Sequence, residues 1–170
     1  KHTVAAVEAH PGQKILDVAA GTGTSSEPFA DAGVDVIAAD LSEGMLEVGR
    51  KRRPDMTFVQ ADVTNLPFND STFDAVTMSY GLRNVQDTAR ALSEMRRVTV
   101  PGGRIVIAEF STPVWPAFRH LYRFYLGSAL PAAARLVSSN TEAYDYLGES
   151  ILAWPDQREL AGLMQEAGWR

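Results

Sequence analysis

Short apolar segments alternate with segments of helical periodicity along most of the chain, and this alternation leaves few folds open. The apolar segments are typical of buried strands and cover residues 14–20, 34–39, 57–61, 73–79 and 104–110. Helices are predicted over residues 24–32, over about 42–52 with Ser42 as N-cap, and over 87–98 with Asp87 as N-cap, and Pro101-Gly102-Gly103 is predicted as a turn. Strands that are apolar on both faces and alternate with helices form a mainly parallel sheet covered on both sides. The sequence therefore predicts a doubly wound α/β fold.

Polar residues follow the carboxyl ends of the predicted strands. Right-handed crossovers bring these ends to one edge of the sheet, and a doubly wound fold binds its ligand along that edge. The residues concerned are Asp17 with the loop after it, Asp40, Asp62 and Ser79. We therefore expect these side chains to gather around one ligand.

The loop Gly21-Thr22-Gly23 follows the first strand and opens a helix. Glycine lets the backbone approach a ligand closely, and a helix N-terminus offers free amide donors. By itself the loop is also compatible with a plain tight turn. Asp40, however, ends the next strand, where a carboxylate accepts both hydroxyls of a ribose. The loop and Asp40 together predict a cofactor that contains a nucleoside.

Two such cofactors fit this pattern, a dinucleotide and S-adenosylmethionine. The dinucleotide motif requires a third glycine three residues after the second, and Ser26 stands at that position. Asp62 ends the third strand, where its carboxylate is placed to accept from an adenine amino group and the Val63 amide to donate to the ring. Three acidic side chains also favour a cationic sulfonium over an anionic pyrophosphate. S-adenosylmethionine is therefore favoured, with a nicotinamide cofactor as the alternative.

The composition excludes several classes of protein. The absence of cysteine excludes a disulfide framework, a thiolate metal site and a cysteine nucleophile. His2, His10 and His120 lack the spacing of metal ligands, so we expect no metal. A net charge of −5 argues against a nucleic-acid partner. No apolar run reaches the ~20 residues that span a bilayer, and the cytoplasm is the expected location.

Several motifs resemble those of a known family. The segment Leu16 to Gly23 (LDVAAGTG) resembles the first motif of class I methyltransferases. More specific matches are Tyr80 to Val85 (YGLRNV), Glu109 to Pro113 (EFSTP) and Tyr144 to Gln157. Together they resemble the ubiquinone/menaquinone biosynthesis C-methyltransferase family over nearly the whole chain. The combination of Val137–Asn140 with Ala153–Pro155 is most similar to the demethylmenaquinone branch of that family.

This resemblance implies methyl transfer from S-adenosylmethionine to a ring carbon of a prenylated quinol. The similarity to the demethylmenaquinone branch implies that the reaction converts demethylmenaquinol to menaquinol. S-adenosylhomocysteine is the implied product, and the reaction needs no metal. With the cofactor contacts that the family implies, the predicted cofactor-binding set is Asp17, Gly21, Thr22, Gly23, Asp40, Leu41, Asp62, Val63 and Ser79. The alternatives are another small-molecule methyltransferase, a non-catalytic ligand-binding domain, and a nicotinamide oxidoreductase, which Ser26 and Asp62 disfavour.

Arg83 and Asn84 follow the fourth strand and are the predicted catalytic residues. A quinol ring carbon becomes nucleophilic when a neighbouring hydroxyl, with a pKa of about 10, loses its proton. We expect Arg83 to stabilise the phenolate, directly or through a water, and not to act as the base, because arginine stays protonated. The alternative is that Arg83 only pairs with a surface carboxylate.

Aromatic residues recur at helical spacing after the fifth strand, with two arginines between them. They are Trp115, Phe118, Tyr122 and Tyr125, with Arg119 and Arg123. One interpretation is a helix packed on the core. The other is an apolar wall for an isoprenoid tail, with peripheral contact to the inner face of a membrane.

The whole of residues 1–170 is predicted to form one domain. We divide it into a cofactor-binding core at 12–110, a helical substrate-side insertion at 111–155 and a last helix at 156–168. Members of the family carry further segments at both ends, so we expect the chain to be truncated at both ends.

Overall fold

The structure, a computed structural model, describes residues 2–129 and 141–170. The chain forms two compact units, one of Lys1–Glu109 with Leu163–Arg170 and the other of Phe110–Gly162. The first unit holds the sheet, and the described part of the second unit is helical. The organisation of residues 1–170 as one domain with a core and an insertion stays a prediction.

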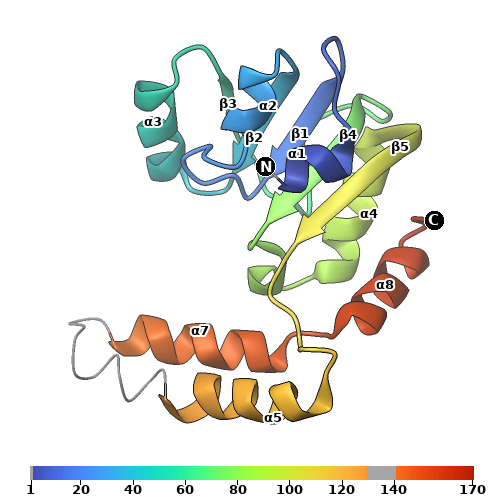
Figure 1. Ribbon diagram of the computed structural model, residues 1–170. Helices are drawn as coiled ribbons and strands as arrows, with labels where there is room; N and C mark the ends of the chain where they lie inside the picture. The colour runs from blue at the N-terminus through green and yellow to red at the C-terminus, as the bar shows by residue number, and fades with distance from the viewer. Residues whose placement is uncertain (1, 130–140) are drawn as a thin grey trace. The chain divides into compact units, whose positions relative to one another are not determined.

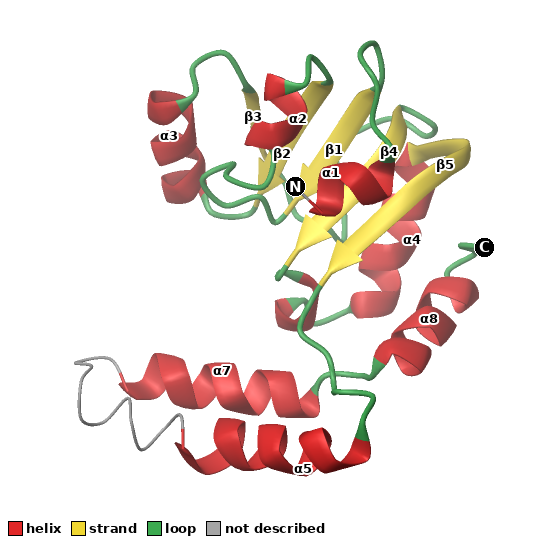
Figure 2. Ribbon diagram, in the orientation of Figure 1, coloured by secondary structure: helices red, strands yellow, loops and turns green. Residues whose placement is uncertain are grey.

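The first unit is built on a five-stranded parallel sheet (Figures 1 and 2). Its strands are β1 (Lys14–Val18), β2 (Asp35–Asp40), β3 (Thr57–Gln60), β4 (Phe73–Ser79) and β5 (Thr99–Ala108). Their order is β3-β2-β1-β4-β5, and every neighbouring pair is parallel. The chain therefore changes direction across the sheet at β1, which puts a switch point beside its carboxyl end. The predicted doubly wound α/β fold is confirmed.

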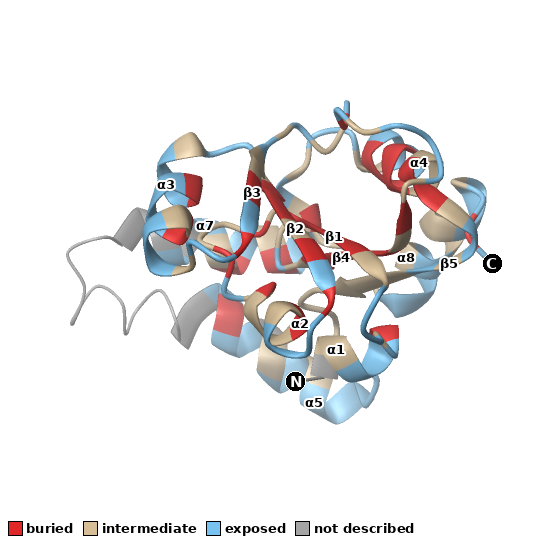
Figure 3. Cartoon of the chain, turned by 90° about the horizontal axis from the view of Figure 1, so that it is seen from above, coloured by how far each residue is buried: buried red, intermediate tan, exposed pale blue. Residues whose placement is uncertain are grey.

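Helices cover both faces of this sheet. They are α1 (His2–Val7), α2 (Glu27–Asp31), α3 (Glu43–Arg52), the short 3-10 helix η1 (Leu82–Asn84) and α4 (Thr88–Val98). Seen from above, α1 and α2 lie on one face and α4 lies on the other (Figure 3). Helix α3 contacts β2 and β3.

Two helices begin at the capping residues that the sequence predicts. Ser42 Oγ accepts from the Met45 amide at 3.4 Å, and Asp87 Oδ1 accepts from the Arg90 amide at 2.9 Å. Each side chain satisfies one of the amides that the first turn of a helix leaves without a partner. Both predicted N-caps are confirmed.

Strands β1 and β5 end two residues earlier than predicted, at Val18 and Ala108, and the predicted boundaries are wrong by more at two further places. Helix α2 begins at Glu27 instead of residue 24, because residues 21–26 form successive turns closed by bonds such as Ser26 N to Gly23 O at 3.0 Å. The turn predicted at Pro101-Gly102-Gly103 is a bulge inside β5. There Thr99 pairs with Phe73, but Arg104 pairs with Ala75. The extra residues of a bulge are accommodated within one strand, so β5 begins earlier than residue 104.

The core of the first unit lies on both sides of the central strands. Its largest fully buried side chains include Phe29, Phe73, Ile15, Leu16, Leu46, Met78, Leu92 and Met95. The chain returns to this core at Trp169, whose indole Nε1 donates to the Leu92 carbonyl of α4 at 3.1 Å. Burial of such side chains stabilises the sheet. The polar residues lie instead at the edge where the carboxyl ends of the strands meet.

The second unit contains α5 (Pro116–Phe124), the π-helical turn η2 (Tyr125–Ala129), α7 (Thr141–Ala153) and the beginning of α8 (Gln157–Glu166). Helix α7 and η2 are in contact, and they approach closely because Gly148 has no side chain. A Cβ there would lie 2.7 Å from the Leu126 carbonyl oxygen. The residues Val137–Asn140, used above for the resemblance, lie outside the described residues. None of the helices in the described part of the chain has both the length and the apolar character that crossing a bilayer requires.

Candidate functional site

A cavity of about 490 Å³ opens at the carboxyl-end edge of the sheet in the first unit. Its lining combines residues that follow β2 and β3 with residues that follow β4. Asp40, Leu41, Asp62, Val63 and Asn84 all line it. Five of the residues that the sequence analysis proposes as site residues are thus brought together, from three different crossovers. Asp40 and Asp62, the two carboxylates on which the cofactor argument depends, share one cavity.

Asp40 is held by two backbone amides. Its Oδ2 accepts from Gly21 N at 2.8 Å, and its Oδ1 accepts from Ser42 N at 2.8 Å. A carboxylate has about four acceptor positions, so this one keeps capacity for two further donors. The geometry fits a diol such as a ribose, whose two neighbouring hydroxyls can each donate.

The glycine loop, Gly21 to Gly23, packs tightly against β3. Gly21 and Gly23 have φ values of +58° and +81°, which residues with a side chain rarely adopt. A Cβ on Gly23 would also lie 2.7 Å from the Phe58 ring. The described residues that line the cavity do not include Gly21, Thr22, Gly23 or Ser79. The cofactor contacts of these four residues stay predictions.

Asp17 lies beneath this loop, fully buried in β1. Its Oδ2 accepts from the hydroxyls of Ser25 and Ser26, each at 2.6 Å, and its Oδ1 accepts from Thr77 Oγ1 at 2.7 Å. Burial raises the pKa of this carboxyl, although the three hydroxyl donors act in the opposite direction. The side chain ties the loop to β1 and β4, while a direct contact between Asp17 and a cofactor stays a prediction.

Ser26 has a role that the sequence analysis missed. From the sequence, Ser26 is only the residue that replaces a glycine of the dinucleotide motif. In the structure its side chain is buried and donates to Asp17. The signal was present in the sequence as a hydroxyl residue at the position of close helix–strand packing, but nothing in the pattern identified its partner.

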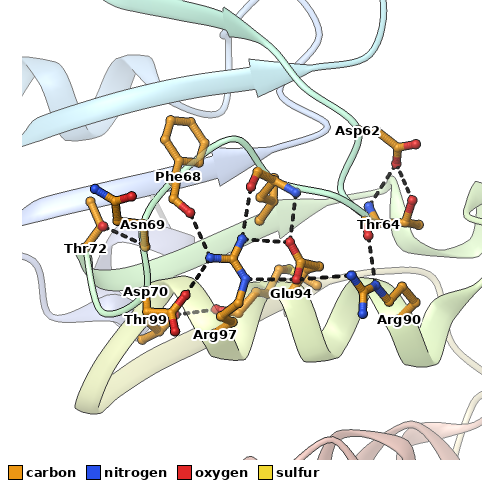
Figure 4. A network of polar contacts seen from close by, with 12 residues as sticks. Asp62, Thr64, Phe68, Asn69, Asp70, Thr72, Arg90, Glu94, Arg97 and Thr99 are labelled. Atoms are coloured by element: carbon orange, nitrogen blue, oxygen red, sulfur yellow. Dashed lines mark hydrogen bonds and ion pairs between the residues drawn. The ribbon is translucent and has the colours of Figure 1, made fainter.

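Asp62 begins a tight turn at the end of β3. Its Oδ1 accepts from both the amide and the hydroxyl of Thr64, each at 2.8 Å, and Figure 4 shows both bonds reaching the same oxygen. The Thr64 amide, followed by the Thr64 hydroxyl, lowers the pKa of this exposed carboxyl. Asp62 is therefore ionised at neutral pH, and Oδ2 keeps its lone pairs for a ligand in the cavity.

Arg83 lies on η1 and is largely buried beside Glu109. Its Nη1 forms an ion pair with Glu109 Oε1 at 2.6 Å and donates to the Tyr80 carbonyl at 2.9 Å. Only 10% of the Arg83 side chain and 2% of the Glu109 side chain are exposed. The carboxylate that pairs with Arg83 is thus buried, not a surface group. Glu109 opens the motif Glu109 to Pro113, but the motif by itself does not place Glu109 in the site.

The turn after β4 has strained geometry. Tyr80 has a φ of +57°, which is uncommon for a residue with a side chain. A Cβ on Gly81, the next residue, would collide with the Ala19 side chain. This sharp turn directs Asn84 to the cavity, and the residues after it, Val85 to Asp87, line the cavity as well. No pattern in the sequence predicts Val85 to Asp87 as part of the site.

Within the described ranges, no group of three or more His, Cys, Asp or Glu side chains is arranged to hold a metal ion.

The sheet order and the cavity at its carboxyl-end edge define the class I S-adenosylmethionine-dependent methyltransferase fold. The structure is similar to the BH2331 protein of Bacillus halodurans, with a TM-score of 0.74 and 26% identity over 98% of this chain and 67% of that one. It is also similar to the S-adenosylmethionine-dependent methyltransferase TM1293 of Thermotoga maritima, with a TM-score of 0.70 and 23% identity over 98% and 68% of the two chains.

The sequence model of the ubiE/COQ5 methyltransferase family matches residues 1–170, and the chain belongs to that family. It is 63% identical to a demethylmenaquinone methyltransferase of Paenarthrobacter aurescens (strain TC1), over 98% of this chain and 66% of the relative. It is 60% identical to a demethylmenaquinone methyltransferase of Beutenbergia cavernae, over 99% of this chain and 70% of that protein. The chain therefore spans about two-thirds of the length of the curated relatives it matches, and the resemblance stated from the motifs is confirmed.

Proposed function

We propose that this protein methylates a ring carbon of a prenylated quinol, converting demethylmenaquinol to menaquinol with S-adenosylmethionine as methyl donor. The observation that carries this proposal is the 63% identity to a demethylmenaquinone methyltransferase over 98% of the chain. The three acidic residues that line the cavity, Asp40, Asp62 and Asp87, support it because they suit a cationic nucleoside.

The residues of the cavity fit S-adenosylmethionine by their donor and acceptor chemistry. Asp40, which keeps two acceptor positions, would hold the ribose hydroxyls. Asp62 would accept from the adenine amino group through Oδ2, and the Val63 amide would donate to the ring. When bound, the cofactor supplies an electrophilic methyl group and leaves as S-adenosylhomocysteine.

Arg83 and Asn84 would act on the quinol. Loss of the proton from a quinol hydroxyl makes the neighbouring ring carbon nucleophilic, and a cation beside the oxygen stabilises the phenolate. The Arg83 guanidinium is fixed by Glu109 and by the Tyr80 carbonyl, so it would meet the phenolate in one orientation. Preorganisation of this kind avoids the cost of reorienting the charge during the reaction.

The test of this role is Arg83→Ala in a methyl-transfer assay. We expect turnover of demethylmenaquinol to fall about 100-fold or more, because one preorganised stabilising group is lost. The affinity for S-adenosylhomocysteine should stay within about threefold, since Asp40 and Asp62 are unchanged. Arg83→Lys keeps a cation beside the buried Glu109 and should recover part of the turnover. Unchanged turnover in folded Arg83→Ala would remove Arg83 from the mechanism.

Two measurements separate this proposal from its alternatives. Calorimetry with S-adenosylhomocysteine and with NADH distinguishes a methyltransferase from a nicotinamide oxidoreductase. Turnover of demethylmenaquinol, compared with that of a benzoquinol, distinguishes the proposed acceptor from other small molecules. Binding of S-adenosylhomocysteine without turnover of any quinol would favour a non-catalytic binding domain.

The helical second unit supplies a candidate surface for the isoprenoid tail. Trp115, Phe118, Leu121 and Phe124 are between 47% and 70% exposed along α5 and at its start. An amphipathic helix with exposed aromatic residues favours contact with acyl chains at a membrane surface. Binding of the whole protein to vesicles of anionic lipid, lost in a Trp115→Ser/Phe118→Ser variant, tests this peripheral contact and the location at the inner face of the membrane.

A further inference from the structure

Side chains of α4 hold the connection between β3 and β4, which runs from residue 61 to residue 72 (Figure 4). This connection begins with Asp62, Val63 and Thr64, which line the cavity. Backbone bonds hold its two ends: Ala61 N donates to the Asp40 carbonyl at 2.9 Å, and Ser71 N and Thr72 N donate to the Arg97 and Val98 carbonyls at 2.9 and 2.7 Å. Between these ends the connection has no helix or strand, and side-chain contacts hold it.

Arg97 uses all five of its N–H donors on this connection and on Glu94. Its Nη1 donates to the Phe68 carbonyl and to Asp70 Oδ1, both at 2.8 Å, and its Nη2 donates to the Leu66 carbonyl at 3.0 Å. The remaining donors, Nε and Nη2, reach the two oxygens of Glu94 at 2.9 and 2.8 Å. A guanidinium that is bonded in this way has one allowed position.

Glu94 is the buried centre of this network, with 5% of its surface exposed. Besides the fork of Arg97, its Oε2 accepts from the Leu66 amide at 2.9 Å. The bonds from Arg97, with smaller contributions from Leu66 and Arg90, lower the pKa of this carboxyl. Glu94 therefore stays ionised and keeps both arginines in place.

Arg90 connects this network to the cavity. It lies one turn before Glu94, within 3.6 Å of its Oε1, and its Nε donates to the Thr64 carbonyl at 3.0 Å. Thr64 in turn donates twice to Asp62. The first turn of the same helix is capped by Asp87, which also lines the cavity. Helix α4 thus begins at one residue of the cavity wall, Asp87, and its Arg90 holds another part of the wall, the turn Asp62–Thr64.

We propose that Arg90, Glu94 and Arg97 form a clamp that positions the turn Asp62–Thr64, so that Asp62 distinguishes adenine from other bases. We call these three residues the α4 clamp. They are positioning residues, since they act on the ligand only through Thr64 and Asp62. The inference rests on the proposed function, in which Asp62 accepts from the adenine amino group.

The test compares S-adenosylhomocysteine with S-inosylhomocysteine, which differ only at the C6–N1 edge of the base: in the inosyl compound a carbonyl oxygen replaces the amino group and N1 carries a hydrogen. The inosyl compound presents a carbonyl oxygen to the carboxylate of Asp62, so it should bind about tenfold or more weakly to the whole wild-type protein. In Arg90→Ala the turn loses its link to Glu94, and we expect this preference to fall at least fivefold. Arg90 is more than half exposed, so its removal should leave the fold intact.

Three comparisons keep the test specific. Arg96→Ala removes an equal charge from the same helix, where the guanidinium lies over Trp169 at 5.7 Å, and should keep the preference. Arg90→Lys keeps a donor for the Thr64 carbonyl and should restore part of the preference for S-adenosylhomocysteine. Glu94→Gln should lower the preference and also the hydrogen-exchange protection of the Leu66 amide.

The outcomes separate the two proposals. A variant Arg90→Ala that binds both ligands more weakly but with the wild-type ratio would overturn the clamp, because a merely structural role moves both affinities together. A wild-type protein that binds both ligands equally would overturn the clamp but leave cofactor binding in place. Failure of the wild-type protein to bind S-adenosylhomocysteine would overturn the proposed function as well.

Discussion

Asp40 and Asp62 end neighbouring strands and line the same cavity, but the structure holds them by different means. Asp40 accepts two backbone amides, Gly21 N and Ser42 N, which belong to turns directly after β1 and β2. Asp62 accepts from Thr64, and Thr64 is held by Arg90 from a helix later in the chain. One carboxylate is fixed by the backbone of the sheet edge, and the other by a network of charged side chains.

Because Asp40 and Asp62 are held by different means, the two sides of the cavity should respond to different kinds of mutation. A backbone amide cannot be removed by mutation of its own side chain, so the Asp40 side is sensitive mainly to steric changes. The Asp62 side depends on the ionisation of Glu94 and on two arginines, so it is sensitive to charge and to pH.

The largest effect is expected from Asp40→Ala. This change removes the acceptor for two hydroxyls, and hydrogen bonds to a charged group contribute ~1.5–3 kcal/mol each. The affinity for S-adenosylhomocysteine, measured by calorimetry, should fall about 100-fold or more. Asp35→Ala is the matched control, because Asp35 is exposed at the other end of β2. Equal affinities of the two variants would contradict the assignment of Asp40 to the ribose.

The steric character of the Asp40 side is tested by two glycines of α3. A Cβ on Gly49 would lie 2.9 Å from the Thr22 carbonyl oxygen and would collide with the Phe58 ring, whereas Gly44 has no atom within 4 Å of its Cβ position. Gly49→Ala should lower the free energy of unfolding by roughly 2 kcal/mol, since overpacking forces backbone shifts. Gly44→Ala should raise it by ~0.5 kcal/mol through helix propensity.

Binding measurements on the same two glycine variants show whether the two sides of the pocket respond independently. Gly49→Ala displaces the glycine loop, so it should weaken binding of S-adenosylhomocysteine and S-inosylhomocysteine by the same factor. A change in the ratio of the two affinities would show that the two sides of the pocket are not independent.

The charge character of the Asp62 side predicts a pH dependence of stability. The pKa of Glu94 is lowered from its ordinary value of 4.5, chiefly by Arg97, so its ionised form stabilises the fold above pH 4.5. That stability is lost as the pH falls through the folded-state pKa. Asp17 has the opposite sign, because burial raises its pKa.

Urea unfolding of wild-type protein and Glu94→Gln checks this prediction. The difference between their free energies of unfolding should narrow by roughly 1 kcal/mol between pH 7 and pH 3.5, because the protonated carboxyl resembles the amide. A difference that stays constant over this range would show that the Glu94 carboxylate does not carry the effect.

Much of the fold could be predicted from local pattern. The strand Phe73–Ser79 and the helix Thr88–Val98 have the predicted bounds, and both predicted N-caps are made. These features depend on residues a few positions apart, where periodicity and capping chemistry are direct physical constraints. The bulge at Pro101–Gly103 was not predictable, because glycine and proline mark an interruption without stating whether a strand continues past it.

The candidate site likewise contains residues that the sequence predicts and residues that it does not. Asp40 and Asp62 were found because strand ends of a parallel sheet meet at one edge, a consequence of topology that the alternation of elements already implies. Glu109 and the α4 clamp were not found. Their partners lie far along the chain, as with Arg97 and Leu66, which are 31 residues apart.

The amino-acid sequence alone predicts the doubly wound sheet, the N-caps of α3 and α4, and the edge at which a nucleoside would bind. Three features follow from tertiary packing instead: Asp17 supports the glycine loop, Arg83 pairs with a buried carboxylate, and α4 holds the turn at Asp62. The physical reason is that apolar periodicity records which face of an element is buried. A hydrogen bond between distant side chains depends on how those buried faces pack, which no local pattern specifies.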